Sequence, residues 1–243
     1  MRIIAMIPAR MGSTRFPGKA LAPLCGKPII QHVYEAATRT ALFDEVLVAT
    51  DSSSIIDAVN SFGGKAVMTS QSHQSGSDRI AEAITGYPAD VIVNIQGDEP
   101  LIDKHSLQQI VSAFDDDTVE VASLYTSIDE IEMLIDSNIV KVVLDSDSNA
   151  IYFSRAPIPY NRDNIPGVNY HRHIGVYAYR QETLLRFVNL PMGVLEQIEK
   201  LEQLRMLEHG IRIRMIPTLY QGIGIDTPQD LLLVESILQG KLS

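Results

Sequence analysis

The sequence contains a single cysteine, Cys25, among its 243 residues. One cysteine cannot form an intramolecular disulfide, and it has no thiolate partner for a structural zinc cluster. The stretch MRIIAMIPAR at the start has only seven residues between its two arginines, which is too short for the apolar part of a signal peptide. We therefore expect a cytoplasmic protein.

Long hydrophobic runs are also missing, since no segment approaches the ~20 apolar residues that cross a bilayer. The formal net charge of -10 disfavours nucleic acid as the main partner. Hydrophobic residues make up 45% of the chain and charged residues 21%, as in ordinary globular proteins. The composition predicts a globular protein with neither a membrane nor a nucleic-acid partner, and the length is compatible with a single domain.

Acidic residues are absent from Met1 to Tyr34, although five basic residues occur there. The loop IPARMGSTRFPGKAL, residues 7–21, has neither the glycine and lysine spacing of a Walker loop nor that of a dinucleotide-binding loop. Its small residues and cationic side chains could still bind a polyanion such as a phosphate chain. The alternative is a solvated surface loop, because exposed Lys and Arg are common.

The first half of the chain alternates β-rich apolar runs with helical patterns, which is typical of βαβ units around a parallel sheet. The predicted strands are residues 2–7, 45–49, 65–68 and 91–95. Predicted helices begin at Pro28, at about Ser53 with a stop at Gly63-Gly64, and near Ser77. The first loop would then follow the first strand of a doubly wound sheet, where ligands usually bind.

The second half has a mixed pattern, which predicts an inserted β-rich segment at about residues 120–190. Strands are expected within residues 119–127, 140–146, 173–179 and 211–218, and a loop at 157–169. One helix is predicted from about Leu195 to Glu208. A last helix should begin after Thr227 as N-cap, with Pro228 in its first turn and Asp230 completing a capping box.

The front loop resembles that of the nucleotidyltransferases that activate acidic sugars, in particular the 3-deoxy-manno-octulosonate (Kdo) cytidylyltransferases. Further matches occur in the order typical of that family: VATD (48–51), HQSGSDR (73–79), VNIQGDEP (93–100), VKVVLD (140–145), IYFSRAPIP (151–159), HIGVYAY (173–179), EKLEQLR (199–205) and IDTPQDL (225–231). The resemblance covers nearly the whole chain. It implies a single Rossmann-like nucleotidyltransferase domain, a mostly parallel sheet flanked by helices with an inserted β-rich segment for dimerisation and substrate binding.

The resemblance implies that the protein converts CTP and Kdo to CMP-Kdo and pyrophosphate, for lipopolysaccharide biosynthesis. Catalysis of such a displacement depends mainly on positioning and on neutralising charge. Arg10, Lys19 and Asp98 are the implied catalytic residues. The implied nucleotide-binding residues are Pro8, Ala9, Arg10, Ser13, Arg15, Lys19, Ser75, Gly76, Arg79, Gln96 and Asp98.

Asp98 and Asp226 are implied as ligands of Mg²⁺, the implied cofactor. Two carboxylates suffice for this ion, because phosphate oxygens and water complete its octahedron. Without the resemblance, Asp98 could be a turn residue, and Asp226 could simply favour the start of a helix. Their large separation in sequence leaves open whether the two carboxylates meet.

The implied sugar-binding residues are Arg155, His173, Tyr177, Glu202 and Gln203. An arginine suits a sugar carboxylate, because its planar fork matches two oxygens. His173 and Tyr177 would lie on the same face of one strand, although Tyr177 could equally be a core residue. The motif HRH at 171–173 could suggest a metal pair, but no third ligand accompanies it.

One departure from the family pattern is the pair Ser77-Asp78, where the family usually has Thr-Glu. The departure conserves the hydroxyl and the charge, but it leaves the local packing open. Alternative substrates are the 8-amino analogue of Kdo and, more distantly, a sialic acid. A non-catalytic nucleotide-binding protein and a nicotinamide dehydrogenase are the other hypotheses, and a homodimer is implied by the family alone.

Overall fold

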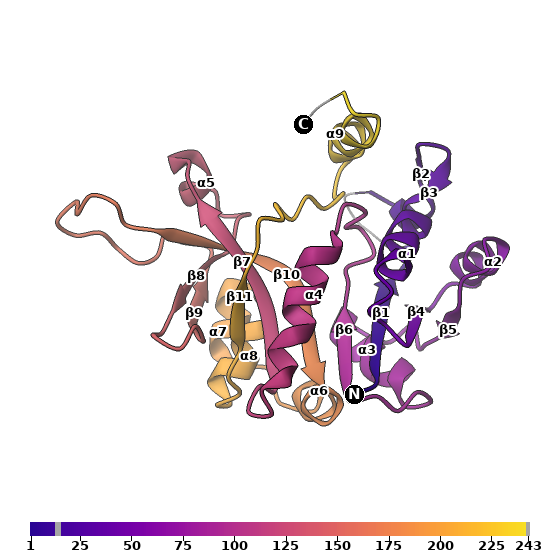
Figure 1. The fold of residues 1–243 in the computed structure, drawn as a ribbon, viewed down its shortest axis with the longest axis horizontal. Coiled ribbons are helices and arrows are strands. Elements are labelled where there is room, and N and C mark those ends of the chain that lie inside the picture. The colour runs from indigo at the N-terminus through magenta and orange to yellow at the C-terminus, as the bar shows by residue number, and fades with distance from the viewer. Residues whose placement is uncertain (13–15, 242–243) are drawn as a thin grey trace. The chain divides into compact units, whose positions relative to one another are not determined.

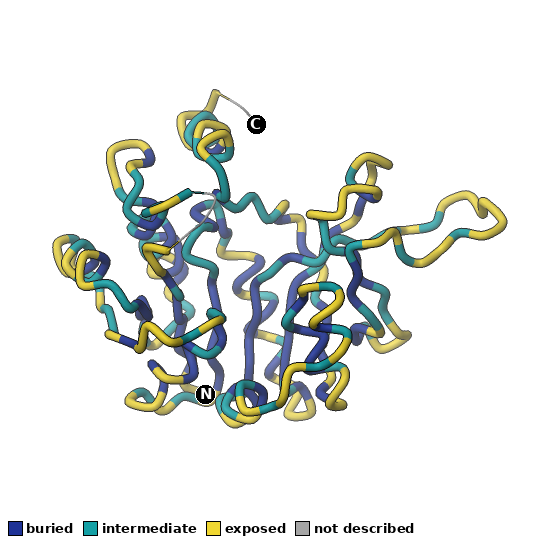
Figure 2. Tube along the Cα trace, turned by 180° about the vertical axis from the view of Figure 1, so that it is seen from behind, coloured by how far each residue is buried: buried dark blue, intermediate teal, exposed yellow. Residues whose placement is uncertain are grey.

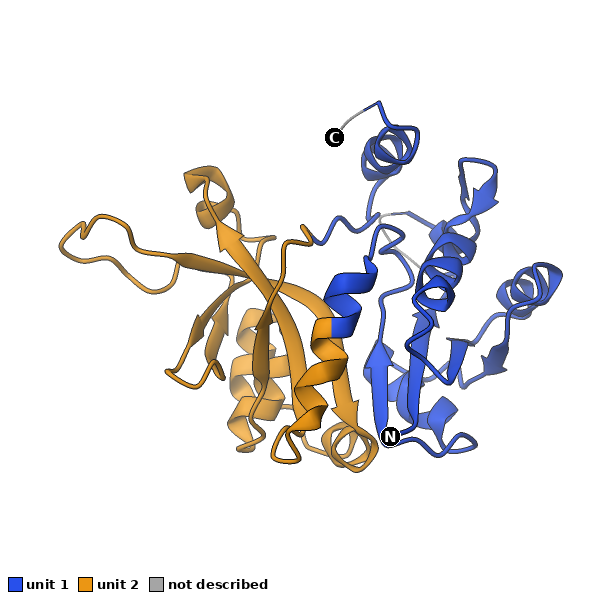
Figure 3. Ribbon diagram, in the orientation of Figure 1, with its two compact units in different colours: residues 1–108, 222–243 blue, residues 109–221 orange. Residues whose placement is uncertain are grey.

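The computed structural model describes residues 1–12 and 16–241. The chain divides into two compact units, drawn in different colours in Figure 3. Unit 1 comprises Met1–Gln108 and Gly222–Ser243, and unit 2 comprises Gln109–Gln221. Unit 1 is therefore built from two separate stretches of sequence, with the whole of unit 2 encoded between them.

Unit 1 contains a parallel sheet in the order β5–β4–β1–β6. The strands are β1 (Ile3–Ala9), β4 (Glu45–Thr50), β5 (Ala66–Met68) and β6 (Val91–Asn94). All four predicted strands are confirmed to within two residues at each end. Strands β1, β4 and β6 are buried along almost their whole length (Figure 2) because helices cover the sheet, which explains their continuous Val, Ile and Ala content.

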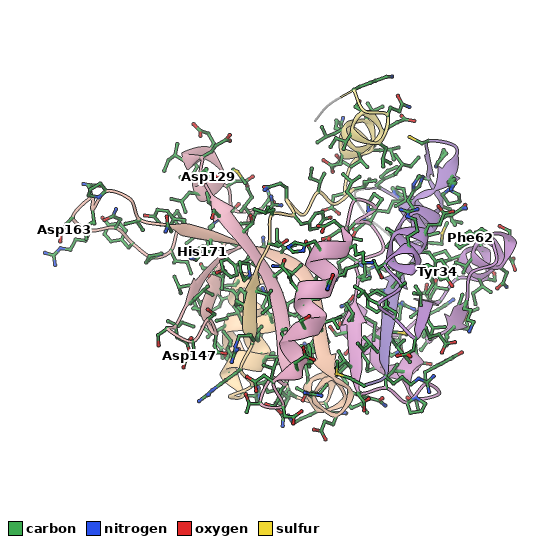
Figure 4. All side chains as sticks on the ribbon, viewed as in Figure 1. Tyr34, Phe62, Asp129, Asp147, Asp163 and His171 are labelled. Atoms are coloured by element: carbon green, nitrogen blue, oxygen red, sulfur yellow. The ribbon has the colours of Figure 1, made fainter. Side chains whose placement is uncertain are left out.

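The four helices predicted in unit 1 begin at their predicted starts or within one residue of them. They are α1 (Ile29–Arg39), α2 (Ser53–Ser61), α3 (Gly76–Ile84) and α9 (Pro228–Leu238), and α4 (Lys104–Ser112) crosses the boundary between the units. Gly63 follows α2 with a φ of 78°, which L side chains rarely adopt. Pro28 is the N-cap of α1 and not its first helical residue, a small correction to the prediction. Tyr34 of α1 packs against Phe62, with ring centroids 5.5 Å apart (Figure 4).

Short elements connect β1 to α1. They are the 3-10 helix η1 (Lys19–Leu21) and the two-stranded ribbon of β2 (Pro23–Leu24) and β3 (Lys27–Pro28). Lys19 is the first residue of η1. The front loop thus ends in an ordered turn, which determines the position of the Lys19 side chain.

Unit 2 is organised around the long strand β10 (Tyr170–Arg180), seen in orange in Figure 1. It pairs antiparallel with β7 (Val121–Ile128) and with β8 (Lys141–Leu144). Strand β8 pairs antiparallel with β9 (Ala150–Ser154), and β11 (Arg214–Pro217) runs parallel to β7. The predicted loop at 157–169 joins β9 to β10 and contains Asp163, labelled in Figure 4.

The predicted helix from Leu195 to Glu208 is wrong in one respect, because two helices occupy this stretch. They are α7 (Val194–Glu199) and α8 (Gln203–Glu208), and Lys200 between them has a left-handed backbone with a φ of 56°. The guanidinium of Arg155 donates hydrogen bonds to the carbonyls of Glu199 and Lys200. These contacts cap the end of α7, so a distant residue ends a helix that the local pattern continues. The other elements of unit 2 are η2 (Ala113–Asp115), α5 (Ile131–Ile135) and α6 (Gln181–Val188).

The parallel sheet with its flanking helices confirms the predicted α/β class. The expected inserted segment at about 120–190 lies within unit 2, and the description of the chain as a single domain stays a prediction. No helix in the described part of the chain is long and apolar enough to span a membrane.

Candidate active site

A pocket of about 310 Å³ opens in unit 1, where β1 and β6 reach their carboxyl ends. This edge of a parallel sheet is where open α/β folds bind ligands. The lining residues are Pro8, Ala9, Arg10, Lys19, Ala20, His73, Gln74, Ser75, Gly76, Arg79, Gln96, Gly97, Asp98 and Asp226. Both predicted metal ligands and most of the predicted nucleotide-binding residues therefore line one cavity.

Close backbone packing shapes the floor of this pocket around Pro8. A Cβ atom added to Gly97 would lie 2.7 Å from the carbonyl oxygen of Pro8, closer than real Cβ contacts. A Cβ added to Gly76 would lie 3.3 Å from the ring of Pro8. Glycine at position 97 thus lets the turn carrying Gln96 and Asp98 lie directly against the end of β1.

The start of α3 forms one wall of the pocket. The Ser75 side chain accepts a hydrogen bond from the Asp78 amide at 3.1 Å, and the Asp78 carboxylate accepts one from the Ser75 amide at 3.3 Å. This is a complete capping box. Aspartate at position 78 therefore performs the capping that a glutamate would perform, and Ser77 is buried. The departure from the family pattern is therefore accommodated by local hydrogen bonds. Because Ser75 and Gly76 line the pocket, the positive end of the α3 dipole lies at the pocket.

Lys19 connects both predicted metal ligands. Its ammonium donates a short hydrogen bond to Asp98, a second to Asp226 at 3.0 Å and a third to the carbonyl of Ile225 at 2.9 Å. Burial works to lower the pKa of Lys19, but the charges and hydrogen bonds of Asp98 and Asp226 outweigh it and raise the pKa above its ordinary value. The two carboxylates thus lie within reach of one cation, which the sequence alone could not establish.

Backbone contacts hold Asp226 beside Asp98. The Ile225 amide donates to the Asp98 carbonyl at 2.9 Å. The carboxylate of Asp230 accepts hydrogen bonds from the amides of Asp226 and Thr227, and Thr227 caps α9 in the predicted box. Thr227 and Asp230 therefore perform the capping, so the Asp226 side chain is directed to Lys19 instead of to the helix start.

The Arg79 side chain is buried and lines the pocket from the same helix, α3. Its guanidinium donates to Asp51 at 2.9 Å and to the Thr69 hydroxyl at 2.5 Å. The carboxylate of Asp51 thus balances the charge of the Arg79 guanidinium. Arg79 lines the pocket and also holds α3 to Asp51. His73 forms a short contact with Glu82, which places its ring at the pocket rim.

Two predicted nucleotide-binding residues lie outside the described part of the chain, and some residues that line the pocket were not predicted. Ser13 and Arg15 lie outside the described residues. Arg10 is exposed and lines the pocket. The prediction missed Ala20, His73, Gln74 and Gly97 as lining residues, and it missed Asp51 as the partner of Arg79. All five lie in stretches that match the family: Ala20 in the front loop, Asp51 in VATD, His73 and Gln74 in HQSGSDR, and Gly97 in VNIQGDEP. Their position next to predicted residues was the available signal.

The predicted sugar-binding residues belong to unit 2, and two of them, His173 and Tyr177, lie on β10. The rings of His173 and Tyr177 lie 5.4 Å apart, although the β7–β10 register shifts between Ile174 and Tyr177. The negative charge of Glu202 acts on the Tyr177 hydroxyl and helps to raise its pKa. Gln203 is buried at the start of α8, directly after Glu202.

The Arg155 side chain is bonded to backbone carbonyls of unit 2. Its guanidinium donates to the carbonyls of Glu199 at 2.8 Å, Ser137 at 2.9 Å and Lys200 at 3.4 Å. A guanidinium has five N–H donors, so part of its capacity serves the backbone and part can serve a ligand. Position 155 therefore links the end of β9 to the turn that carries Glu202 and Gln203.

Burial sets the protonation of the two rings. It lowers the pKa of His173 to about 3, with the nearby charge of Arg172 adding to the effect. Burial also raises the pKa of the Tyr177 hydroxyl well above its ordinary value, with Tyr179 and Glu202 contributing. Both side chains are therefore neutral at physiological pH, and the Nε2 atom of His173 lies 3.0 Å from the Ser123 hydroxyl oxygen. His171, labelled in Figure 4, packs on Tyr125 with ring centroids 4.8 Å apart, and the described residues contain no group of three or more His, Cys, Asp or Glu that could hold a metal.

The low pKa of His173 predicts a specific acid sensitivity. In the unfolded chain, a histidine has a pKa of about 6.5 and is protonated below that pH. In the folded protein, His173 is not protonated until the pH falls to about 3. Stability therefore falls as the pH drops from 6.5, by up to about 2 kcal/mol at pH 5. Urea unfolding at pH 7.5 and 5.0 should show a smaller acid-induced loss for His173→Gln than for wild type, with exposed His105→Gln as the matched control. Equal losses in wild type and His173→Gln would contradict the assignment.

Comparison with known proteins gives a consistent result. The cytidylyltransferase family profile matches residues 4–213. The chain is 50% identical to the 3-deoxy-manno-octulosonate cytidylyltransferase of Flavobacterium johnsoniae, over 98% of this chain and 99% of the relative. It is 49% identical to the protein of the same name from Thermodesulfovibrio yellowstonii, over 98% of each chain.

Solved structures agree with these relatives. A CMP:2-keto-3-deoxy-manno-octonic acid synthetase complexed with CTP superposes with a TM-score of 0.95, at 43% identity over the whole of both chains. The 4-diphosphocytidyl-2C-methyl-D-erythritol synthase of Anaerococcus prevotii, at 14% identity and a TM-score of 0.66 over 98% of each chain, shares the fold alone. With half of its residues identical to a full-length relative, the chain belongs to the 3-deoxy-manno-octulosonate cytidylyltransferase family.

Proposed function

We propose that this protein transfers CMP from CTP to the anomeric hydroxyl of Kdo and releases pyrophosphate. The observation that supports this most directly is the convergence of Lys19, Asp98 and Asp226 in a pocket at the carboxyl edge of the parallel sheet. Such a pocket combines positive groups for phosphates with carboxylates for a cation. Membership of the Kdo-named family supports Kdo as the acceptor.

In the proposed reaction the sugar hydroxyl oxygen forms a bond to the α-phosphorus of CTP and loses its proton. The bond between the α-phosphorus and the bridging oxygen breaks, and pyrophosphate leaves with that oxygen. Arg10, Lys19 and the amides at the start of α3 neutralise the triphosphate and the negative charge that develops on the leaving group. Pro8, Ala9, Ser75, Gly76, Arg79 and Gln96 shape the cavity around the nucleotide, and Ser13 and Arg15 are proposed to complete it.

We assign Asp98 and Asp226 as the residues that hold Mg²⁺. This assignment is supported by the way both carboxylates bond a single positive group, the ammonium of Lys19. Two carboxylates supplemented by phosphate oxygens and water are the donor set that Mg²⁺ prefers. When bound, the ion supplies charge for holding the triphosphate and lowers the pKa of the attacking hydroxyl.

For the sugar acid we assign Arg155, His173, Tyr177, Glu202 and Gln203. The contact between the rings of His173 and Tyr177 and the negative charge of nearby Glu202 support a shared polar cluster in unit 2. Neutral His173 and protonated Tyr177 suit sugar hydroxyls, and the remaining donors of Arg155 suit the carboxylate.

A homodimer in the cytoplasm, acting in lipopolysaccharide biosynthesis, completes the proposal. Unit 2 exposes several large apolar side chains that a subunit contact could cover, namely Ile151, Tyr160 and Ile165. The cytoplasm is where CTP is supplied, and a chain with one cysteine suits it.

Pyrophosphate release tests the proposed function. With Mg²⁺ present, CTP, UTP and ATP are each combined with Kdo, its 8-amino analogue and a sialic acid. We expect release with CTP and Kdo to exceed that of every other pair, and omission of Mg²⁺ to abolish it. Faster turnover of the 8-amino compound would assign the alternative substrate, and no release with CTP and either compound would reject the proposal.

A further inference from the structure

Lys141 is a buried lysine with no exposed surface. A charged ammonium taken out of water is costly unless its donors are bonded. Its three donors reach the carbonyls of Asp136 at 2.9 Å, Ile139 at 2.6 Å and Arg155 at 2.5 Å. Since an ammonium has three N–H groups, the whole donor capacity of Lys141 is used on the backbone.

The strand positions around Lys141 connect it to two of the proposed sugar-binding residues. Lys141 pairs with Ser154 in the β8–β9 ladder, directly before Arg155. On its other side β8 pairs with β10, where Lys141 lies opposite Arg172 and the His173 amide donates to the carbonyl of Val140 at 2.9 Å. Lys141 therefore lies between the strand that ends at Arg155 and the strand that carries His173.

Arg155 connects the backbone held by Lys141 to the turn after α7. Its side chain binds the carbonyls of Glu199 and Lys200, and its amide donates to the Glu199 carboxylate at 3.0 Å. That carboxylate also accepts a hydrogen bond from the Ser154 hydroxyl at 2.6 Å. Glu202 and Gln203 follow this turn immediately, so their position depends on where Arg155 is held.

We propose that Lys141 is a positioning residue for the sugar acid: through the Arg155 carbonyl and the β8 backbone it sets the positions of Arg155, His173 and the turn before Glu202. It does not touch substrate, because its donors are used on three carbonyls from separate parts of the chain. The inference rests on the proposed function, since it assigns a role toward the sugar acid of that reaction. It predicts an effect on the sugar that is separate from any effect on CTP.

Steady-state kinetics of Lys141→Met test the proposal in the full chain. Methionine matches the lysine side chain as far as its Cε atom and removes the three hydrogen bonds of the ammonium. We expect the KM for Kdo, measured at saturating CTP, to rise at least ~10-fold, because small displacements of binding groups are costly, while the KM for CTP changes less than about twofold. The matched control is Lys65→Met, which removes an exposed lysine that is ion-paired with Glu45 in unit 1. An equal rise in both KM values, or no rise for Kdo, would overturn the proposal.

A second variant covers the case in which Lys141→Met does not fold. Glu199→Gln keeps the shape of the turn and weakens the bonds to Ser154 and Arg155, so it should raise the KM for Kdo and spare the KM for CTP. A normal KM for Kdo in folded Glu199→Gln would then overturn the proposal.

Hydrogen exchange separates this inference from the proposed function, because it needs no substrate. In Lys141→Met, or in Glu199→Gln if the first variant does not fold, the amides of segments 154–156 and 199–204 should exchange at least ~10-fold faster, since contacts that hold these segments are lost or weakened. Segment 3–9 of β1 should exchange as in wild type. If neither segment exchanges faster, the positioning role of Lys141 is refuted, whichever sugar the wild type uses. If the wild type does not turn over Kdo, only the proposed substrate is refuted.

Discussion

Asp98→Asn is expected to lower turnover by at least ~100-fold while the protein stays folded. Asparagine has nearly the same size as aspartate, but it removes one of the two carboxylates that share a cation with Lys19. The loss should appear in kcat at saturating CTP and Kdo, because the charge acts on the triphosphate during its cleavage. Pyrophosphate release measures it, and circular dichroism with a thermal melt reports the fold.

The matched control for this prediction is Asp57→Asn. Asp57 is exposed on α2 in the same unit, so its replacement removes an equal charge away from the pocket. The control should keep turnover within about twofold of wild type, as expected for surface changes. Near-normal turnover in a folded Asp98→Asn protein would show that Asp98 is not a metal ligand.

Lys19→Ala should lower kcat/KM for CTP by about 100-fold, the size of effect found when one stabilising donor is removed. The KM for Kdo should change much less, because the sugar-binding residues that we propose belong to unit 2. Lys27→Ala is the matched control, since Lys27 is another basic residue of the acid-free segment and is ion-paired with Glu35. Unchanged kcat and KM for CTP in Lys19→Ala would contradict the assignment.

The same variant has a second readout that needs no turnover. Without the Lys19 ammonium, Asp98 and Asp226 lose the cation that bonds them both. Mn²⁺ binding to the nucleotide-free protein, followed by electron paramagnetic resonance, should therefore tighten by at least ~10-fold, because close carboxylates favour an opposite charge. Weaker or equal Mn²⁺ binding would argue against a cation site formed by these two residues.

Much of the fold could be predicted because its signals are local. The continuous apolar runs of β1, β4 and β6 indicate strands covered on both faces, and Thr227, Pro228 and Asp230 form the predicted helix start. The break at Lys200 could not be predicted, because it depends on carbonyl contacts from Arg155, which is distant in the sequence. Residues 194–208 have a helical pattern on their own, and tertiary contacts override it.

The candidate site also has one part that local sequence signals predict and another part that depends on tertiary contacts. The motifs identify which residues belong to it, but the meeting of Asp98 with Asp226 depends on a backbone hydrogen bond from Ile225 and on the position of Lys19. The pairing of Arg79 with Asp51 is equally invisible in the sequence, because each residue has an ordinary local role. Sequence reasoning thus assigned Arg79 to the nucleotide without its bonds to Asp51 and Thr69.

The discontinuous sequence of unit 1 has a consequence for synthesis. Lys19 and Asp98 are translated before unit 2, and Asp226 is translated after it. A ribosome-bound chain that has been translated just past Asp98 therefore has Lys19 and one of the two carboxylates, but not Asp226. On the proposed function, the growing polypeptide stays unable to consume CTP until all of residues 109–221 have been made.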